Sequence, residues 1–389
     1  MNVAIAALSA PAQLNGVSRH AANLARALLC QRGISAVHFL AGEWQQGMFP
    51  ELVDECDPRL HLHWISLRHG NLSRLAWFFA KLPQLSNDLK VDLVHLAYPA
   101  PVRAGAMPSP VVVTLHDLYP FDIPENFGYL RSMVSRRIVR QCLNNVSAVA
   151  CVSASTRSQL TRWFGVEMAN KAEVILNAVE SKPAASRSPL FERGGGASFI
   201  LCVAQHRQNK NVPLAIRIFA NAVGKGILTP ETQLLIIGIP GPASALVKKQ
   251  IRQSRVEGQV RLLSGVSEAE LQGCYRHCKF LLAPSSIEGF GLPIAEALLT
   301  GCPVVCSDIP AFREIGHDAV RYVPFGNQVL EGYNRAIREV LVEARPNALR
   351  LQHLSPQVIG SQYLDFYRKV INMSCAPEMK RQLNVRSLS

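Results

Sequence analysis

Residues 280–305 read FLLAPSSIEGFGLPIAEALLTGCPVV, and this stretch combines a buried strand, a glycine turn and a helix start. The apolar run Phe280–Ala283 is typical of an interior strand of a parallel sheet. The turn at Gly289–Gly291 follows, with glycines that are free to take positive φ. Pro293 stands where the first helical residue is expected, because its missing N–H costs nothing there. A helix running to about Leu299 would aim its first amides at the turn, which predicts an anion site suited to a diphosphate.

Two acidic residues flank the turn. Glu288 stands directly before it, and Glu296 follows eight positions later. A carboxylate close to a phosphate needs neutral hydrogen-bond donors, and the vicinal diol of a ribose or hexose offers two. The pattern therefore predicts a nucleotide-sugar site. A capped helix that carries a surface glutamate is the alternative interpretation.

The segment EGFGLPIAEALLTGCPVV resembles the signature EGFGLPxxEAxxxGxPVV of the family 4 retaining glycosyltransferases of GT-B fold. The resemblance implies an α/β chain with two doubly wound parallel-sheet (Rossmann-like) domains that face each other across a cleft. It also implies transfer of a hexose-type sugar from a nucleoside diphosphate sugar to an acceptor hydroxyl with retention of configuration, in cell-surface polysaccharide or glycolipid assembly. Glu288 would meet the donor sugar, and Glu296 the nucleotide ribose.

Three further residues match, or stand close to, catalytic positions of that family. His116 follows the predicted strand Val111–Leu115, at the strand end where open α/β sheets place ligand-contacting groups. Lys210 matches the family lysine that binds donor phosphate. The family arginine falls at Gln205, so Arg207 is the expected replacement. The alternatives are a buried histidine paired with its neighbouring acid and a surface loop.

The resemblance implies that the donor is held without a metal ion or any cofactor. No D-x-D motif occurs in the sequence, and the pair Cys274 and Cys278 has no second pair of ligands nearby. Positive side chains and helix amides would instead stabilise the departing diphosphate. The remaining donor-binding residues implied by the resemblance are Gly16, Val266, Gly289, Phe290, Gly291 and Leu292.

Length and composition predict two domains. A chain of 389 residues exceeds one ordinary core, and a Pro-, Gly- and Ser-rich linker covers residues 177–198. We expect an acceptor-side domain at 1–180, a nucleotide-sugar-binding domain at 181–355 and a helix at 356–373 that packs back on the first domain. That helix is predicted to have an apolar side made of Val358, Tyr363, Phe366, Tyr367, Val370 and Ile371.

Strand signals mark both predicted sheets. In the first domain they are residues 3–8, 34–40, 60–65, 93–96, 111–115 and 148–152. In the second they end at residue 204 and then cover 234–237, 260–263, 280–283 and 303–306. No run approaches the roughly 20 apolar residues of a spanning helix, and no C-x-x-C pair occurs, so we expect cytoplasmic residence.

The net charge of +13 is locally concentrated. Residues 126–165 contain no acid but hold Arg131, Arg136, Arg137, Arg140, Arg157 and Arg162. Such a face suits peripheral contact with an anionic membrane, at the inner face of the cell membrane, or with a glycan or lipid-linked acceptor; a solvated face is the alternative. Nucleic acid is not expected, because no aromatic residues alternate with the arginines. A nucleotide-sugar epimerase and a non-catalytic nucleotide-sugar binding protein remain open as alternative functions.

Overall fold

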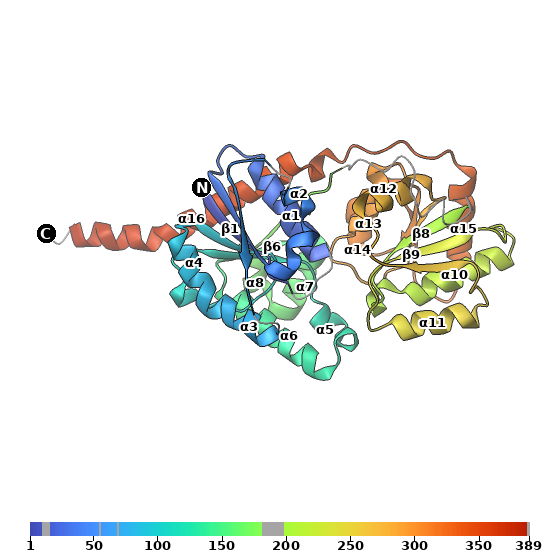
Figure 1. The fold of residues 1–389 in the computed structure, drawn as a ribbon, viewed down its shortest axis with the longest axis horizontal. Helices are drawn as coiled ribbons and strands as arrows, with labels where there is room; N and C mark the ends of the chain where they lie inside the picture. The colour runs from blue at the N-terminus through green and yellow to red at the C-terminus, as the bar shows by residue number, and fades with distance from the viewer. Residues whose placement is uncertain (10–15, 54–55, 68–69, 181–197, 387–389) are drawn as a thin grey trace. The chain divides into compact units, whose positions relative to one another are not determined.

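The computed structural model describes residues 1–9, 16–53, 56–67, 70–180 and 198–386. It divides into two compact units, each built around one parallel sheet (Figure 1). The first unit contains Met1–Leu118, Met133–Ala178 and Gln352–Ser389, and the second contains Tyr119–Ser132 and Val179–Leu351. These two parallel-sheet α/β units confirm the predicted fold class.

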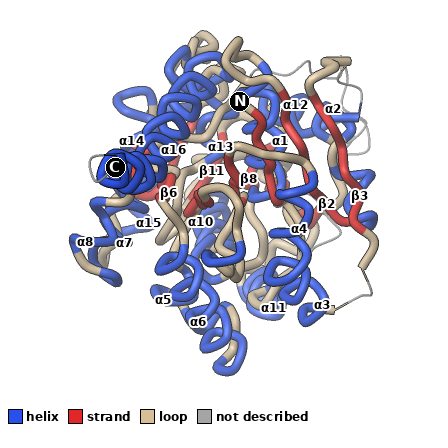
Figure 2. The backbone as a smooth tube through the Cα atoms, turned by 90° about the vertical axis from the view of Figure 1, so that its left-hand side faces the viewer, coloured by secondary structure: helices blue, strands red, loops and turns tan. Residues whose placement is uncertain are grey.

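The sheet of the first unit has the strand order β3-β2-β1-β4-β5-β6-β7, with every pairing parallel. Figure 2 shows β1, β2 and β3 side by side. The strands are β1 (Asn2–Ala6), β2 (Ala36–Gly42), β3 (Leu60–Ile65), β4 (Leu93–Leu96), β5 (Val111–Leu115), β6 (Ala148–Cys151) and β7 (Ala172–Val174). The chain order reverses between β1 and β4.

The sheet of the second unit has the order β10-β9-β8-β11-β12-β13, also parallel throughout. Its strands are β8 (Phe199–Val203), β9 (Gln233–Ile237), β10 (Val260–Leu263), β11 (Leu281–Ala283), β12 (Val304–Ser307) and β13 (Arg321–Val323). Here the chain order reverses between β8 and β11, which places a switch point in the middle of the sheet.

Helices connect the strands in both units (Figure 1). The α-helices among residues 1–180 are α1 (Gly16–Leu29), α2 (Pro50–Val53), α3 (Asn71–Ala76), α4 (Leu82–Asp88), α5 (Tyr119–Asp122), α6 (Tyr129–Asn145), α7 (Ala154–Phe164) and α8 (Val166–Asn170). Those after residue 197 are α10 (Val212–Gly224), α11 (Ser244–Gln253), α12 (Glu268–His277), α13 (Leu292–Leu299), α14 (Pro310–Gly316), α15 (Val329–Val342) and α16 (Pro356–Arg386). Within the described residues, no helix has an apolar stretch that could cross a bilayer.

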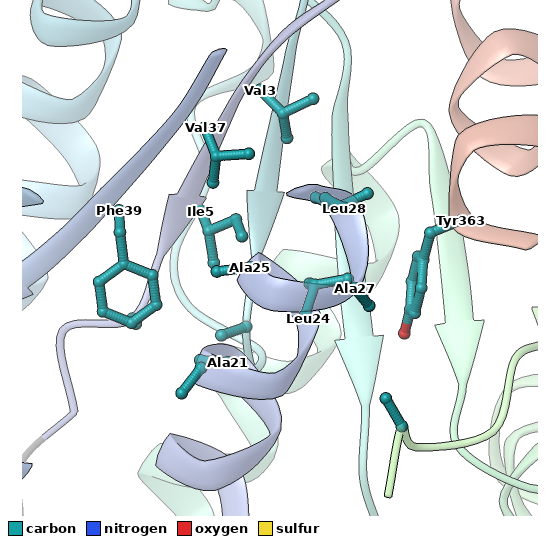
Figure 3. Packing of buried hydrophobic residues seen from close by; sticks show 14 of the residues in the cluster. Val3, Ile5, Ala21, Leu24, Ala25, Ala27, Leu28, Val37, Phe39 and Tyr363 are labelled. Carbon is teal, nitrogen blue, oxygen red and sulfur yellow. The ribbon is translucent and has the colours of Figure 1, made fainter. Parts of the chain in front are cut away.

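The core of the first unit forms where α1 and α16 pack together. Leu24 and Leu28 repeat at helical spacing and are almost fully buried beside the sheet residues Val3 and Ile5 (Figure 3). Gly360 makes the close approach of α16 possible, because a Cβ at this position would lie 2.0 Å from the carbonyl oxygen of Ala27. The approach brings the tyrosines of α16 to the buried face of the sheet.

Two expectations about the final helix were wrong. Val358 is 39% exposed, and Ile359 and Leu364 are buried instead. The helix also runs to Arg386, beyond the expected end at residue 373. The register differs because the first turn of α16 faces α1 through Ile359 and Gly360.

Candidate active site

The switch point of the second sheet gathers the charged residues predicted from the sequence. The loop after β8 carries Lys210, and the loop after the neighbouring strand β11 carries Glu288. A small cavity at this point is lined by the ends of both strands together with Lys210, Glu288 and Pro293. Open α/β sheets bind ligands in the crevice outside the carboxyl ends of such strands.

Lys210 and Glu288 form an ion pair. The lysine Nζ donates to both carboxylate oxygens, at 2.6 Å to Oε1 and 2.8 Å to Oε2. The side chains are only 20% and 8% exposed, so solvent screens the pair weakly. The sequence predicted two separate contacts to the donor, and the structure adds that the two groups contact each other.

Side chains that the sequence analysis missed hold these loops in place. The hydroxyl of Tyr119 lies 3.4 Å from Oε2 of Glu288 and 3.3 Å from the carbonyl oxygen of Ile287. The amide of Asn209 donates to the same carbonyl at 3.2 Å, and Asn126 donates to Oδ1 of Asn209 at 3.2 Å. Tyr119 and Asn126 precede the linker by more than 50 positions yet belong to the second unit. No local pattern marks them, because their partners are far away in sequence.

The glycine turn leads into α13 one residue earlier than predicted. Leu292 is the first helical residue and Pro293 the second, with Gly291 as N-cap at φ +110°. A side chain at Gly291 would be strained at this φ, and its Cβ would also lie only 3.1 Å from the Phe312 ring. Phe290 is 4% exposed, so its ring packs inside the unit. The helix start predicted as an anion site therefore adjoins the ion pair.

Glu296 lies on α13 with its carboxylate buried, at 6% exposure. The hydroxyl of Tyr275, on α12, donates to its Oε2 at 2.9 Å. A carboxylate has about four acceptor sites, and the hydrogen bond from Tyr275 uses one of them and orients the group. Tyr275 was not predicted, since a lone tyrosine on a helix carries no sequence signal for this role.

Two other predicted residues, the catalytic candidate Arg207 and the donor-binding candidate Val266, lie on loops of the second unit. Arg207 is half-buried at the start of the loop that carries Lys210. Within the part of the chain that the structure describes, its guanidinium has no ion-pair partner, unlike Lys210. Val266 is half-buried between β10 and α12, next to Gly265 at φ +69°.

The first unit contains the predicted residues His116 and Gly16. His116 follows β5, and its Nε2 lies 2.9 Å from the carbonyl oxygen of Ala97, so Nε2 carries the proton and Nδ1 is an acceptor. Burial lowers the pKa of His116 to about 4, so the ring is neutral at pH 7. His20 packs edge-on against it, with ring centroids 4.8 Å apart. Gly16 is exposed at the start of α1, and the loop before it, residues 10–15, lies outside the described residues.

The other predicted site residues all belong to the second unit. The structure brings Lys210 and Glu288 together and anchors Glu296 on the helix that follows them. No group of three or more His, Cys, Asp or Glu suited to a metal ion occurs among the described residues.

Two family models match almost the whole chain between them. The model described as Glycosyl transferases group 1 matches residues 191–350, and the model described as Glycosyltransferase Family 4 matches residues 14–182. This chain belongs to the group 1 glycosyltransferases. The resemblance that rested on Glu288 and Glu296 is thereby confirmed at the level of the family.

Named relatives of this group 1 glycosyltransferase include two enzymes of O-antigen chains. The O-antigen chain mannosyltransferase RfbU of Salmonella typhimurium is 24% identical over 61% of this chain. The O-antigen chain mannosyltransferase B of Escherichia coli is 23% identical over 79% of this chain. The matches span 62% of the first relative, which is less than two thirds of its length, and 82% of the second.

A solved structure of similar fold is Anabaena Alr3699/HepE in complex with UDP-glucose. Its TM-score is 0.67 at 16% identity, and the alignment covers 97% of this chain and 100% of that one. At this identity the likeness establishes the GT-B fold alone.

Proposed function

We propose that this group 1 glycosyltransferase moves a hexose from a nucleoside diphosphate sugar to an acceptor hydroxyl, with retention of anomeric configuration. The observation that carries the proposal is the Lys210–Glu288 ion pair at the switch point of the second sheet, with Glu296 on the helix that follows. A cation, a helix start and an oriented carboxylate match the diphosphate and ribose of such a donor.

The interaction between Lys210 and the diphosphate is the contact that should strengthen most during the reaction. Negative charge builds up on the diphosphate as the glycosidic bond breaks, and a cation in a weakly screened site stabilises that charge. The first turn of α13 adds its amides and the positive end of the helix dipole. Arg207, three residues before Lys210, is the second candidate cation.

Glu288 and His116 are the groups that we assign to the sugar. Glu288 accepts hydrogen bonds from donor hydroxyls, and the unprotonated Nδ1 of His116 accepts one more. No side chain in the proposed site is an obvious covalent nucleophile. We therefore propose that the departing phosphate deprotonates the acceptor on the same face of the sugar, which retains the configuration.

The relatives support a proposal for the class of donor and acceptor. Both named O-antigen enzymes are mannosyltransferases, and the solved structure of similar fold holds UDP-glucose. We infer a hexose donor and a growing glycan or lipid-linked glycan as acceptor, hence a role in polysaccharide assembly. The positive groups of the second unit take the place of a metal clamp, so we expect that EDTA leaves the activity unchanged.

Calorimetric titration with UDP-, GDP- and dTDP-sugars tests the donor assignment. One nucleotide should bind the wild type and fail to bind a Lys210→Ala, Glu296→Ala double variant, with Lys225→Ala as a control for loss of an exposed lysine in the same unit. The preferred donor is then incubated with lipid-linked glycan extracts, and the anomeric proton coupling of the product reports the configuration. Conversion of the donor sugar without acceptor would favour an epimerase, and binding without turnover would favour a non-catalytic protein.

We also propose that α6 contacts an anionic membrane surface. Its exposed side chains are both apolar and basic: Tyr129 is 80% exposed and Leu130 is 76% exposed, and Arg131 and Arg137 of the same helix are also exposed. Apolar side chains beside arginines suit a helix that lies in the lipid headgroup layer, where each basic residue contributes about 1 kcal/mol. The apolar residues are a feature that the arginine pattern alone did not reveal.

Sedimentation with anionic liposomes tests this contact. Tyr129→Ser, Leu130→Ser and the change of Arg131 and Arg137 to Gln should each reduce binding, and the arginine variant should resemble wild type at high salt. Changing two exposed basic residues of α11, Lys248 and Lys249, to Gln removes the same charge elsewhere and serves as the control. Equal binding by all variants at low salt would show that α6 is a solvated surface helix without membrane contact.

A further inference from the structure

A buried chain of polar side chains crosses the first unit from α16 to α1. The hydroxyl of Tyr367 lies 2.5 Å from Nδ1 of His95, whose Nε2 lies 2.7 Å from Oγ1 of Thr114. The same Oγ1 lies 3.1 Å from Nε2 of His20 and 3.4 Å from the hydroxyl of Tyr363. Figure 3 shows Tyr363 extending from α16 beside α1.

All five side chains are at most 3% exposed. A donor or acceptor in this chain that loses its hydrogen-bond partner therefore costs free energy, because water cannot replace the partner. Burial raises the pKa of Tyr367 and of Tyr363, which keeps both as neutral phenols with a proton to donate. Burial likewise lowers the pKa of His95 to about 3, so this ring is neutral and has one N–H.

The protons can be placed by counting donors and acceptors. The assignment that gives every buried proton in the chain an acceptor has the Tyr367 hydroxyl donating to Nδ1 of His95, which then carries its own proton on Nε2. In this assignment that N–H and the hydroxyl of Tyr363 both donate to Oγ1 of Thr114. The Thr114 proton then goes to Nε2 of His20, which carries its own proton on Nδ1, and Asn177 is a further hydrogen-bond partner of this ring.

The chain ends at the ring that packs against His116. His20 and His116 meet edge to face, with an interplanar angle of 83°. A change of tautomer at His20 moves a proton from one side of the ring to the other and changes the surface that His116 contacts.

We propose that Tyr367 is a positioning residue for glycosyl transfer. Through hydrogen bonds to His95 and Thr114 it fixes the tautomer of His20, and the tautomer of His20 in turn fixes the position of the His116 ring. This inference rests on the role proposed for His116. Tyr363 contacts the same Thr114 but only as a second donor, so it does not set the direction of the chain.

Tyr367→Phe tests the proposal, and Tyr363→Phe is the matched control, because both changes remove one hydroxyl from the same helix and network. Imidazole ¹⁵N shifts of histidine-labelled protein distinguish the two neutral tautomers. We expect the Nδ1–H form of His20 in the wild type and in Tyr363→Phe, and a mixture of tautomers in Tyr367→Phe. The kcat of Tyr367→Phe should fall about 10-fold with little change in the donor KM, which is less than the 10²-fold that a 1 Å misplacement can cause.

Several results would overturn the proposal. Identical histidine spectra in the two variants would show that Tyr367 does not set the tautomer, and equal losses of kcat would show a general effect of α16 packing. A tautomer change without a loss of kcat would remove the positioning role. Thr114→Val, which removes the central hydroxyl, should release His20 in the same way if Tyr367→Phe does not fold. A wild type that lacks transferase activity refutes the proposed function, whereas the spectra still test the hydrogen-bond chain.

Discussion

Replacing Glu288 with Gln should make the protein less stable but a tighter binder of nucleoside diphosphate. The change removes the negative partner of Lys210 and keeps the shape of the side chain. Lys210, only 20% exposed, then has a poorly compensated charge. A bound diphosphate would supply that compensation, so ligand binding and the loss of the carboxylate should be coupled.

The burial of the pair determines the size of the effect. Removing one partner of a buried ion pair costs about 3 to 5 kcal/mol, and we expect the lower value because Lys210 keeps some exposure and the Gln oxygen still accepts a hydrogen bond. If half of that cost is relieved by the ligand, affinity for the diphosphate rises by about 1.4 kcal/mol, or tenfold. Turnover should also fall, because the contact that we propose between Glu288 and the donor sugar would lose its negative charge.

Isothermal titration with the preferred nucleoside diphosphate measures the coupling, and urea unfolding measures the loss of stability. Glu331→Gln is the control, since its ion pair with Lys225 belongs to the same unit but is largely exposed. Such a surface pair contributes at most about 1 kcal/mol, and its removal should leave nucleotide affinity unchanged. Unchanged or weaker diphosphate binding by Glu288→Gln would refute the placement of the phosphates at Lys210.

Two further predictions concern the second unit, and a third concerns the first unit. Glu296→Ala should weaken binding of the nucleoside diphosphate by about 1.5 to 3 kcal/mol, the value of a charged hydrogen bond, and unchanged calorimetric affinity would remove its ribose role. Lys210→Ala should lower kcat by about 10²-fold and raise the donor KM much less, because its charge acts mainly as the bond breaks; an unchanged kcat would make it a structural residue. The first unit should lose stability as pH falls from about 6.5 to 4. Burial lowers the pKa of His20, His95 and His116, so the unfolded chain binds more protons in this range, and each histidine lowers the free energy of unfolding by about 1.4 kcal/mol per pH unit. Urea midpoints that stay constant over this range would contradict these pKa values.

The sequence predicted the interior of both sheets well. The strands β3, β4, β5 and β10 begin and end at the predicted residues. For β4 and β5 the reason is that a strand buried on both faces needs an apolar segment. The edge strands β3 and β10 are less buried and also contain polar residues. The strands β7 and β13 were missed. They are three residues long, and AEV and RYV each contain a charged residue, so only their neighbours in the sheet identify them.

The candidate site also contains residues that the sequence predicted and residues that only the fold reveals. Glu288, Glu296 and the glycine turn lie within nine consecutive positions, so local spacing carries the signal. The contacts of Tyr119 and Tyr275 to these two acids, and the chain from Tyr367 to His20, join residues that are 19 to 272 positions apart. Such partners are set by how the helices pack, and no pattern along the chain encodes them.

We propose that the second unit binds a nucleoside diphosphate sugar at the carboxyl ends of β8 and β11. A crystal structure with the preferred nucleoside diphosphate would test this placement. We expect phosphate oxygens within hydrogen-bond distance of Nζ of Lys210 and of the first turn of α13, and ribose hydroxyls on the carboxylate of Glu296. Electron density for the nucleotide elsewhere, with the Lys210–Glu288 pair and the Glu296 carboxylate free of ligand, would contradict it.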